Sequence, residues 1–418
     1  MRVYPKVFRA GKKARIYYVP RTAAEKVEIR IFGMERYSLP RTERMRIDEE
    51  VRHPFMPMEK VGDALYAIDY TFPTEQRYTF RVVEDGNHGG YGSFYAVGDD
   101  LFDLGFYKGD THLHSCRSDG VGEPLSVAIA YRRAGFDFMC LTDHHRYAPS
   151  LEARDAVLPL TDAFTVFPGE EVHNKDMGYV HIVNFGGRSS VNDIIENDPD
   201  YVKERLAAIR EAVILPEDVD AATTHMRLFI TDEIRRAGGL AVLAHPYWNT
   251  GGEYSMESAE MVYHLKNGSF DALELLASDD HDGNGDNLQV ALYYALREEG
   301  VRTPILGASD RHDPEKPTSL FNRHFSLVYA ESAAAIPDAV GRGMSVAVNR
   351  RSDDDFFVFG DYRLVKYTRF LLSEFYPHYA TLTAAHADAL AAASGTRTEA
   401  IAAAEAEINA FRAQFFTE

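Results

Sequence analysis

The sequence predicts an α/β protein in three parts: a small antiparallel β-sandwich over residues 1–105, a mainly parallel α/β barrel over 106–360, and a helical C-terminal extension over 361–418 that packs on the barrel. Short segments rich in Val, Ile, Tyr and Phe, separated by turn residues, predict the sandwich. From about Phe106, short apolar runs alternate with helical patterns, which is typical of the strands and helices of a parallel sheet. The final segment is rich in alanine, a strong helix former.

The first part contains several predicted strands, of which the clearest are Ala14–Val19, Val27–Phe32, Ala64–Tyr70 and Tyr78–Val83. The stretch Glu84–Gly92 contains Asp85-Gly86 and Gly89-Gly90, which favour a turn after the last of them. We expect this part to supply no metal ligand, because His53 and His88 are isolated. A domain of this kind more often buttresses its neighbour, and binding of a sugar or a protein is the alternative.

The second part alternates between further strand and helix patterns. The predicted strands are Phe136–Thr142, Thr165–Pro168, Val180–Phe185, Leu240–Ala244, Ala272–Leu276 and Ile305–Gly307, and the predicted helices are Pro124–Ala134, Thr231–Ala237 and Asn287–Glu299. We interpret the polar segment Asn192–Asp220 as an insertion over the barrel mouth. The helical tail is predicted from about Tyr367 to Phe416, with a break near Ser394-Gly395.

The composition limits the partners and the compartment. The 418 residues are 45% hydrophobic, enough to fill a sizeable core, and their formal net charge is −19. An acidic surface repels long nucleic-acid backbones but allows a local pocket for one small anion. With two cysteines, Cys116 and Cys140, no apolar run in the first ten residues and no stretch near the roughly 20 apolar residues of a membrane span, we expect a soluble cytoplasmic protein.

The strongest chemical signal is Gly-Asp-Thr-His-Leu-His-Ser at 109–115, followed by Ser-Asp-Gly at 118–120. His112 and His114 are two residues apart, which in a strand places both imidazoles on one face. Two imidazoles on one face are able to hold one metal ion. This spacing therefore indicates a metal site after the first strand of the second part.

Four further motifs follow apolar strands: Thr-Asp-His-His at 142–145, Gly-Glu-Glu-Val-His at 169–173, Ala-His-Pro at 244–246 and Ala-Ser-Asp-Arg-His at 308–312. Asp310 and His312 are again two apart, so we expect them to share one strand face. His181 lies within an apolar run and, taken alone, would more often be a hydrogen-bonded core histidine. Buried acids and imidazoles are costly unless they are paired or bound to metal.

Each motif lies at the C-terminal end of a predicted strand. In a parallel α/β barrel those ends meet at one rim, where active sites lie. Five clusters of this kind rarely converge by chance. Nitrogen and oxygen ligands without cysteine suit zinc, manganese or iron.

In this order the motifs resemble those of the polymerase-and-histidinol-phosphatase (PHP) superfamily of metallohydrolases. The resemblance covers about Phe106–Val348, more than half of the chain. It implies a distorted (β/α)7 barrel with two or three divalent metal ions at its mouth. The sandwich ahead of the barrel resembles the arrangement in the carbaryl-hydrolase-like branch, whose substrates are mostly unassigned.

The resemblance also implies three groups of metal ligands, the first two bridged by one glutamate. The first group is His112, His114, Glu171 and Asp310; the second is Glu171, His181 and His245; the third is Asp119, His144 and His312. Asp119 stands where some relatives have histidine. Glu170 is the other candidate bridge, but the Gly-x-Glu spacing favours Glu171. His173 shares a strand face with Glu171 and is a ligand, a substrate contact or a structural residue.

Metal chemistry indicates how such a site would work. Two close cations would bind a bridging hydroxide that is nucleophilic near neutral pH, and the cations would hold phosphoryl oxygens. The residues assigned to catalysis are Glu171, Asp143, His173 and Arg117, with Asp143 orienting a ligand from behind. The residues assigned to the substrate are Arg117, Arg146, Arg311, Arg323 and His281, although each arginine could equally be a solvated surface residue. His281, in the loop Asp279–Asp286, is also a candidate for the acid that protonates the leaving group.

The favoured function is hydrolysis of a small phosphate mono- or diester. The same site could hydrolyse a carboxylic ester, a carbamate or an amide, and the sign of that function would be apolar cavity walls without converging arginines. A non-catalytic binding or regulatory module is the third alternative. Its sign would be missing ligands, whereas the ligand set in this sequence is complete.

Overall fold

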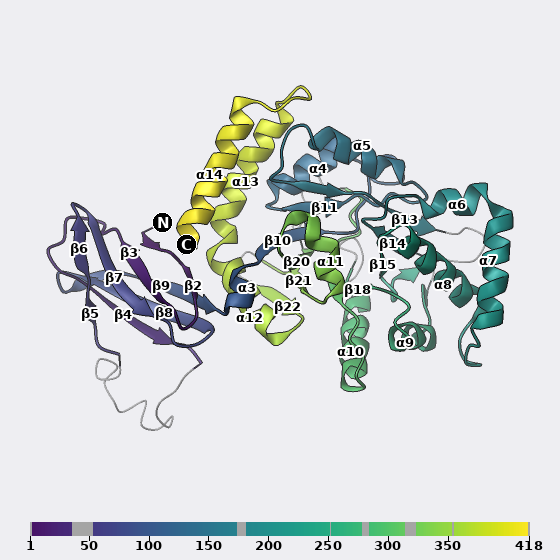
Figure 1. Ribbon diagram of the computed structural model, residues 1–418, viewed down its shortest axis with the longest axis horizontal. Coiled ribbons are helices and arrows are strands. Elements are labelled where there is room, and N and C mark those ends of the chain that lie inside the picture. The colour runs from purple at the N-terminus through teal and green to yellow at the C-terminus, as the bar shows by residue number, and fades with distance from the viewer. Residues whose placement is uncertain are drawn as a thin grey trace. The chain divides into compact units, whose positions relative to one another are not determined.

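The computed structural model describes residues 2–35, 53–173, 181–250, 252–277, 284–313, 323–352 and 355–416 of a mixed α/β protein (Figure 1). The chain divides into two compact units. The first comprises Met1–Leu104, Val365–Tyr379 and Ala406–Glu418, and the second comprises Gly105–Leu364 and Ala380–Glu405. No helix in the described ranges is long and apolar enough to cross a membrane.

Two sheets form most of the first unit, with strand orders β1-β3-β7-β6 and β2-β9-β8-β4-β5. Their strands, with one short helix, are β1 (Val3–Tyr4), β2 (Val7–Arg9), β3 (Lys13–Tyr18), β4 (Val27–Gly33), β5 (Met56–Pro57), β6 (Glu59–Gly62), β7 (Leu65–Thr71), β8 (Gln76–Glu84), β9 (Asn87–Val97) and α3 (Asp99–Phe102). Ile16 and Tyr66 of one sheet and Ile29, Phe80 and Phe94 of the other belong to one buried core. The clearest predicted strands correspond to β3, β4, β7 and β8.

The predicted turn after β8 is present. Asp85 and Gly86, which join β8 to β9, have φ values of 48° and 81°. A two-residue hairpin turn of type I′ requires positive φ at both central positions, which explains why Asp-Gly stands there. The sequence of this hairpin therefore sets its register.

Two further sheets form the second unit, with orders β12-β11-β10-β20-β21-β22 and β13-β14-β15-β18-β19. Their strands are β10 (Gly105–Asp110), β11 (Phe138–Cys140), β12 (Thr165–Phe167), β13 (Gly169–His173), β14 (His181–Phe185), β15 (Leu240–Leu243), β18 (Ala272–Leu276), β19 (Ile305–Gly307), β20 (His324–Ala330), β21 (Ser345–Arg350) and β22 (Phe356–Phe359). A small hairpin, β16 (Asn249–Thr250) with β17 (Glu253–Tyr254), stands apart from both sheets.

The expectation of a mainly parallel arrangement is wrong, because these sheets are mixed. β10, β11 and β12 run parallel, as do β15, β18 and β19, but β13–β14–β15 and β10–β20–β21–β22 are antiparallel. The connections from β13 to β14 and from β21 to β22 are too short for the crossover that parallel neighbours need. The chain therefore reverses direction at these two connections, and it reverses again between β14 and β15 and between β20 and β21.

The two sheets of the second unit meet along two lines. Pro168 alone separates β12 from β13. On the other side, Ser326 Oγ of β20 accepts a hydrogen bond from Gly307 N and donates one to Gly307 O, at 3.0 and 2.9 Å. A Cβ atom at Gly307 would lie 2.5 Å from the Phe325 carbonyl oxygen, so glycine allows this close approach. Closure into a (β/α)7 barrel remains a proposal.

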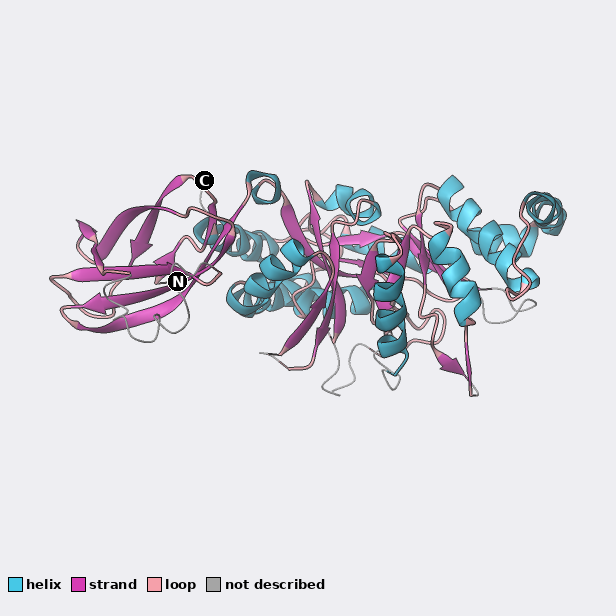
Figure 2. Ribbon diagram, turned by 90° about the horizontal axis from the view of Figure 1, so that it is seen from below, coloured by secondary structure: helices cyan, strands magenta, loops and turns pink. Residues whose placement is uncertain are grey.

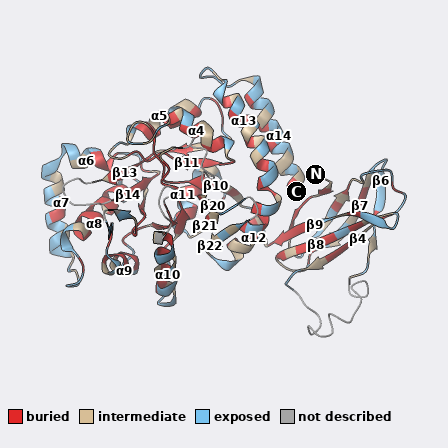
Figure 3. Cartoon of the chain, turned by 180° about the vertical axis from the view of Figure 1, so that it is seen from behind, coloured by how far each residue is buried: buried red, intermediate tan, exposed pale blue. Residues whose placement is uncertain are grey.

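Helices lie on the outside of these sheets (Figure 2). They are α4 (Pro124–Arg133), α5 (Ala148–Val157), α6 (Val191–Asn197), α7 (Pro199–Ala212), α8 (Ala221–Arg236), α9 (Ser258–Lys266), α10 (Asn284–Glu298), η1 (Ala333–Ala335) and α11 (Ile336–Gly341). In Figure 3 the strands are largely buried, whereas α7 is largely exposed and buries Leu206 alone. The predicted segment Asn192–Asp220 thus contributes most of α6 and all of α7.

Helix α8 begins earlier than the predicted Thr231. The Asp220 side chain accepts a hydrogen bond from Thr223 N at 2.8 Å and caps the helix at Ala221. The buried residues Met226, Phe229 and Ile230 follow at helical spacing before Thr231.

The predicted helical tail is present as α12 (Tyr362–Glu374), α13 (Tyr376–Ala391) and α14 (Glu399–Phe415). The predicted break at Ser394-Gly395 falls between α13 and α14, where Gly395 has a φ of 79°. Residues of these helices belong to both units. Packing of the whole tail on a barrel therefore stays a prediction.

Candidate metal centre

The first two histidines of the centre follow β10 rather than lying within it. β10 ends at Asp110, and the next residues stay extended because Leu113 forms a bridge with Arg311. This extension still places both rings in one cluster, with the ring centroids of His112 and His114 5.2 Å apart. The buried Asp110 carboxylate fixes the start of the loop by accepting a hydrogen bond from His112 N at 3.2 Å.

Glu171 is the residue around which the imidazoles gather. It is fully buried inside β13, not at the end of a strand as predicted. Its Oε2 atom lies 3.2 Å from His112 Nε2, 3.5 Å from His114 Nε2 and 2.8 Å from His144 Nδ1. Its Oε1 atom lies 2.5 Å from His181 Nδ1. One carboxylate therefore faces imidazoles from three predicted groups.

Glu170 faces away from this cluster. Its carboxylate accepts hydrogen bonds from Val191 N, Ser190 Oγ and Asn192 Nδ2 at 2.6 to 2.8 Å. Adjacent residues of a strand point to opposite faces, so only one of the two glutamates can reach the cluster. The spacing argument that favoured Glu171 over Glu170 therefore agrees with the geometry.

His181 belongs to the apolar run that the sequence shows, and it is the first residue of β14. Because β14 is antiparallel to β13, its first residue lies beside the last residue of β13, and His173 pairs with His181. His245 follows β15, and its Nε2 atom is 3.4 Å from Glu171 Oε1. An antiparallel hairpin thus brings a strand start to the same edge as the strand ends.

Three residues of the centre have backbone conformations that side chains other than glycine rarely adopt. The φ values are 58° at His145, 21° at His245 and 51° at Asp310. At Asp310 this conformation ends the extended path after β19, so Asp310 and His312 do not share a regular strand face as predicted. Strain of this kind persists where the surrounding structure enforces it, and it gathers at functional sites.

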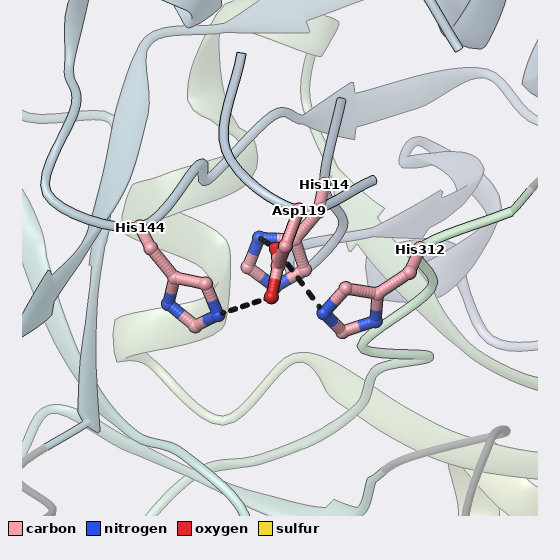
Figure 4. Close-up of side chains that lie close together, drawn as sticks. All are labelled: His114, Asp119, His144 and His312. Atoms are coloured by element: carbon pink, nitrogen blue, oxygen red, sulfur yellow. Dashed lines mark ion pairs between the residues drawn. The ribbon is translucent and has the colours of Figure 1, made fainter. Parts of the chain in front are cut away.

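The third predicted group is more open than the others. Figure 4 shows the Asp119 carboxylate between the rings of His144 and His312, with His114 behind it. Asp119 oxygens lie 3.5 Å from His144 Nε2, 3.4 Å from His312 Nε2 and 3.9 Å from His114 Nδ1. The Asp119 side chain is 56% exposed, whereas the Glu171 side chain is fully buried.

Four sets of ligand atoms lie close enough together to hold a metal ion. They are His112, His114, Glu171 and Asp310; Glu171, His181 and His245; His114, Asp119, His144 and His312; and His144, His173 and His181. The first three sets contain every residue that the sequence predicted as a ligand. The fourth set adds His173, which the sequence argument left open.

The unpaired atoms of the cluster fit cations. Among the described residues, His112 Nε2, His114 Nδ1 and Glu171 Oε2 are buried without a hydrogen-bond partner of suitable geometry. Buried polar atoms without partners are rare in proteins, and a divalent cation would satisfy them together.

Charge balance in the cluster supports the same fit. Burial raises the pKa of Glu171, but the imidazoles of His181, His112 and His144 hold it well below its usual range. Burial lowers the pKa of His144, but Glu171 and Asp119 raise it to about 10. Metal ligands must be deprotonated, so cations that bind here would displace protons from these rings.

Glu274 is a buried member of the site that the sequence argument missed. Its Oε1 atom is 2.9 Å from His112 Nδ1, and its Oε2 atom accepts a hydrogen bond from His245 N at 3.1 Å. The bond to Nδ1 leaves Nε2 of His112 as the atom that could bind a cation. The available signal was a glutamate at the centre of the apolar strand β18, Ala-Leu-Glu-Leu-Leu.

Asp143 holds the loop that joins two ligands. Its carboxylate accepts hydrogen bonds from Ser115 N, Ser115 Oγ and Ser118 Oγ at 2.9, 2.7 and 2.6 Å. These residues lie between His114 and Asp119. Asp143 therefore acts on the ligands through this loop.

A cavity of about 1100 Å³ opens beside the cluster. It is lined by Arg117, Ser118, Asp119, His144, His145, Arg146, Tyr147, Ala148, Pro149, Leu151, Glu152, His173, His181, Asp193, Glu196 and Trp248. Trp248 was not predicted; its ring centroid lies 5.5 Å from that of His181 and 5.4 Å from that of His245. Asp193 and Glu196 belong to α6, so the predicted insertion borders the site.

The predicted substrate arginines occupy different places. Arg117 lines the cavity but is held by Glu152 at 2.6 Å and Glu123 at 2.8 Å. Arg146 also lines the cavity and is exposed, and the described residues include no ion-pair partner for it.

Arg311 and Arg323 are not among the residues that line this cavity. Arg311 is 1% exposed, and its Nε atom donates to the Asp313 carbonyl oxygen at 2.8 Å. Arg323 lies near Asp286, whose pKa it lowers against the raising effect of burial. His281 lies outside the described residues.

Comparison with known proteins gives limited similarity. No protein-family profile matches the chain. A stretch of 48 residues is 42% identical to the DNA polymerase/3'-5' exonuclease PolX of Bacillus subtilis (strain 168), and it spans 12% of this chain and 8% of that protein.

Three solved structures match parts of the chain at low identity. A two-domain protein of Bacteroides vulgatus, described as containing a PHP-like metal-dependent phosphoesterase, is 18% identical with a TM-score of 0.41, over 59% of this chain and 65% of that one. A protein of Bifidobacterium adolescentis described as a metal-dependent phosphoesterase is 16% identical with a TM-score of 0.37, over 51% and 90%. An amidohydrolase of Chromobacterium violaceum is 20% identical with a TM-score of 0.31, over 50% and 88%. None of these similarities establishes a family or an activity for this chain.

Proposed function

We propose that this chain is a PHP-type metallohydrolase that uses two or three divalent ions of zinc, manganese or iron to hydrolyse a small phosphate mono- or diester. The observation that carries the proposal is the ligand set around Glu171. Each of the four sets of ligand atoms shares residues with two of the others, and Glu171 belongs to two of the sets. A carboxylate that serves two sets is the arrangement expected of a bridge between two cations.

Divalent cations at such a site lower the pKa of water and stabilise the charge that develops on the reacting phosphoryl group. The chain's own residues hold this machinery in place. Glu171 and Asp310 supply negative charge to the first set, and Glu274 fixes the ring orientation of His112. Asp143 fixes the loop that carries His114 and Asp119.

Arg146 is the side chain that we assign to the substrate anion. It lines the same cavity as His144 and Asp119, and its guanidinium group is exposed. An arginine presents parallel N–H groups that match two oxygens of a phosphate. The guanidinium group of Arg117 already forms ion pairs with Glu152 and Glu123, so we expect Arg117 to contribute less to binding of the substrate anion.

The cavity favours a compact ligand. Its volume of about 1100 Å³ lies just above the range of roughly 300–1,000 Å³ for small-molecule sites. Asp193 and Glu196 place negative charge on its wall, and the chain carries a formal net charge of −19. A long nucleic-acid backbone would be repelled by this surface, so we assign a small phosphate ester.

Hydrolysis of a carboxylic ester, a carbamate or an amide is the competing function, because cations of this kind also activate water toward a carbonyl carbon. Tyr147, Pro149, Leu151 and Trp248 give the cavity apolar walls, which suit such substrates. The exposed Arg146 in the same cavity favours the phosphate ester.

The deciding experiment compares substrate classes on protein reconstituted with zinc, manganese or iron. Values of kcat/KM are measured for phosphate monoesters, phosphate diesters, carboxylic esters and a labelled oligonucleotide at matched ionic strength. We expect small phosphate esters to be turned over best. Turnover of carboxylic esters alone, or an oligonucleotide preferred by about tenfold or more, would exclude the proposed substrate class.

A matched pair of variants tests the role of Arg146. A hydrogen bond to a charged group contributes roughly 1.5–3 kcal/mol, so Arg146→Ala should lower kcat/KM for the phosphate ester by about 10- to 100-fold. Arg154→Ala is the control, because Arg154 pairs with Asp155 and is not among the lining residues. Equal effects of the two substitutions would remove Arg146 from the substrate site.

A further inference from the structure

His173 contacts a predicted metal ligand at hydrogen-bond distance. Its Nε2 atom lies 2.7 Å from His181 Nε2, while the other ring nitrogen of His181, Nδ1, lies 2.5 Å from Glu171 Oε1. His181 therefore has one nitrogen directed to the second set of ligands and the other directed to His173. The contact lies on the wall of the cavity, which both histidines line.

The backbone holds His173 in this position. His173 N donates a hydrogen bond to Asn192 Oδ1 at 3.2 Å, and Asn192 Nδ2 donates to the Glu171 carbonyl oxygen, also at 3.2 Å. One asparagine thus fixes both the residue that carries the bridge and His173, two positions further along β13.

A fourth cation between His144, His173 and His181 is the competing explanation, since these three also form a set of close ligand atoms. The nitrogens of His144 are already directed elsewhere, with Nδ1 2.8 Å from Glu171 and Nε2 3.5 Å from Asp119. The 2.7 Å separation of the two Nε2 atoms is the length of a hydrogen bond. The geometry therefore favours a histidine pair over a fourth ion.

We infer that His173 is a positioning residue that accepts a hydrogen bond from His181 Nε2–H and so presents His181 Nδ1 to the cation of the second set. This inference rests on the proposed metal-dependent function. A neutral imidazole carries one N–H, so a ligand at Nδ1 must hold its hydrogen on Nε2. His173 then accepts at Nε2 and carries its own hydrogen on Nδ1.

The first and second sets of ligands would then differ in how tightly they bind their cations. His112 in the first set donates to the carboxylate of Glu274, whereas His181 in the second set donates to a neutral imidazole. A carboxylate partner makes a ligating imidazole more basic than a neutral partner does. The second set should therefore release its cation more readily than the first.

The experiment measures cation release from the full-length protein during titration with a chelator, followed by elemental analysis. Wild-type protein should lose its cations in at least two steps. His173→Phe keeps a ring but accepts no hydrogen bond. It should weaken the cation affinity of the more labile step by about 10- to 100-fold and change the affinity of the tighter step by less than about threefold. His173→Gln, whose side-chain oxygen accepts a hydrogen bond, should restore the labile step to within about threefold of wild type.

Two controls separate this role from a loss of folding. His145→Asn changes the neighbouring ring, which lies 4.7 Å from that of His173, and should leave both steps unchanged; asparagine tolerates the positive φ at this position. His173→Ala tests the same hydrogen bond if the phenylalanine is not accommodated, and circular dichroism of each variant checks the fold.

The outcomes are distinct. An unchanged labile step in folded His173→Phe and His173→Ala would overturn the inference. Loss of one whole equivalent in His173→Gln at saturating metal would also overturn it, because His173 would then be a ligand. Wild-type protein that binds less than one equivalent would overturn both this inference and the proposed function, whereas normal metal binding without phosphate-ester turnover would overturn only the substrate assignment.

Discussion

Replacement of Glu274 by glutamine tests whether the buried carboxylate behind His112 sets the affinity of the first ligand set. The carboxylate accepts from His112 Nδ1 at 2.9 Å through one oxygen and from His245 N at 3.1 Å through the other. An amide has one oxygen, so Glu274→Gln can satisfy only one of these donors. The other donor would face the amide N–H₂ group in a fully buried place.

The size of the effect follows from these two contacts. Exchange of a charge-assisted hydrogen bond for a neutral one loses about 1–2 kcal/mol, which corresponds to roughly 5- to 30-fold weaker cation binding. The unsatisfied donor costs about 1–3 kcal/mol of folding stability. We therefore expect the tighter chelation step to weaken by roughly tenfold and the metal-free protein to unfold at lower urea concentration.

Chelator titration gives the affinity, and urea unfolding of the metal-free protein gives the stability. Glu170→Gln is the matched control: its carboxylate is equally buried and accepts from Val191 N and Ser190 Oγ, but faces away from the cluster. It should lower stability and leave the affinity of the tighter chelation step within about threefold of wild type. Cation binding within twofold of wild type in a folded Glu274→Gln protein would refute this reasoning.

Three further outcomes are expected. Glu171→Gln should abolish turnover and remove at least one equivalent of metal on elemental analysis, because a neutral amide cannot replace the bridging charge; retained metal and near wild-type activity would show that the bridge lies elsewhere. Burial raises the pKa of Asp286 to about 7 from 3.8, so the folded protein binds this proton more tightly than the unfolded chain. The protonated carboxyl of Asp286 therefore contributes its full stabilisation below about pH 4. The free energy of unfolding falls by on the order of 4 kcal/mol as the pH rises through 7. The melting temperature of Asp286→Asn should therefore rise relative to that of wild type between about pH 4 and pH 8. A difference in melting temperature that does not change with pH would contradict the assignment. A thiol reagent should label the half-exposed Cys116 in the native protein but reach Cys140, whose pKa burial raises to about 12, only after unfolding; equal labelling of both would show that β11 opens readily.

Much of the candidate site could be predicted from the sequence. The polar motifs, together with the family resemblance, named nine residues as metal ligands, and all nine belong to the sets of close ligand atoms. A strand that ends in imidazoles and acids is unusual without a metal. The Gly-x-Glu spacing also favoured Glu171 over Glu170, and the alternation of side chains along β13 explains why only Glu171 faces the cluster. These inferences depend on patterns within a few consecutive residues of the sequence.

The tertiary structure decided the rest. Glu274 and His112 are 162 residues apart in sequence, and their contact depends on β18 and β10 belonging to sheets that meet. The pairing of His173 with His181 depends on β14 being antiparallel to β13, which a rule for parallel strands does not anticipate. The sequence named four arginines as candidates, but only the folded chain showed which of them line the cavity. Strand direction and long-range contacts arise from packing of the whole unit, and for that reason local patterns indicated the candidate ligands and Asp143 but not Glu274 or the pairing of His173 with His181.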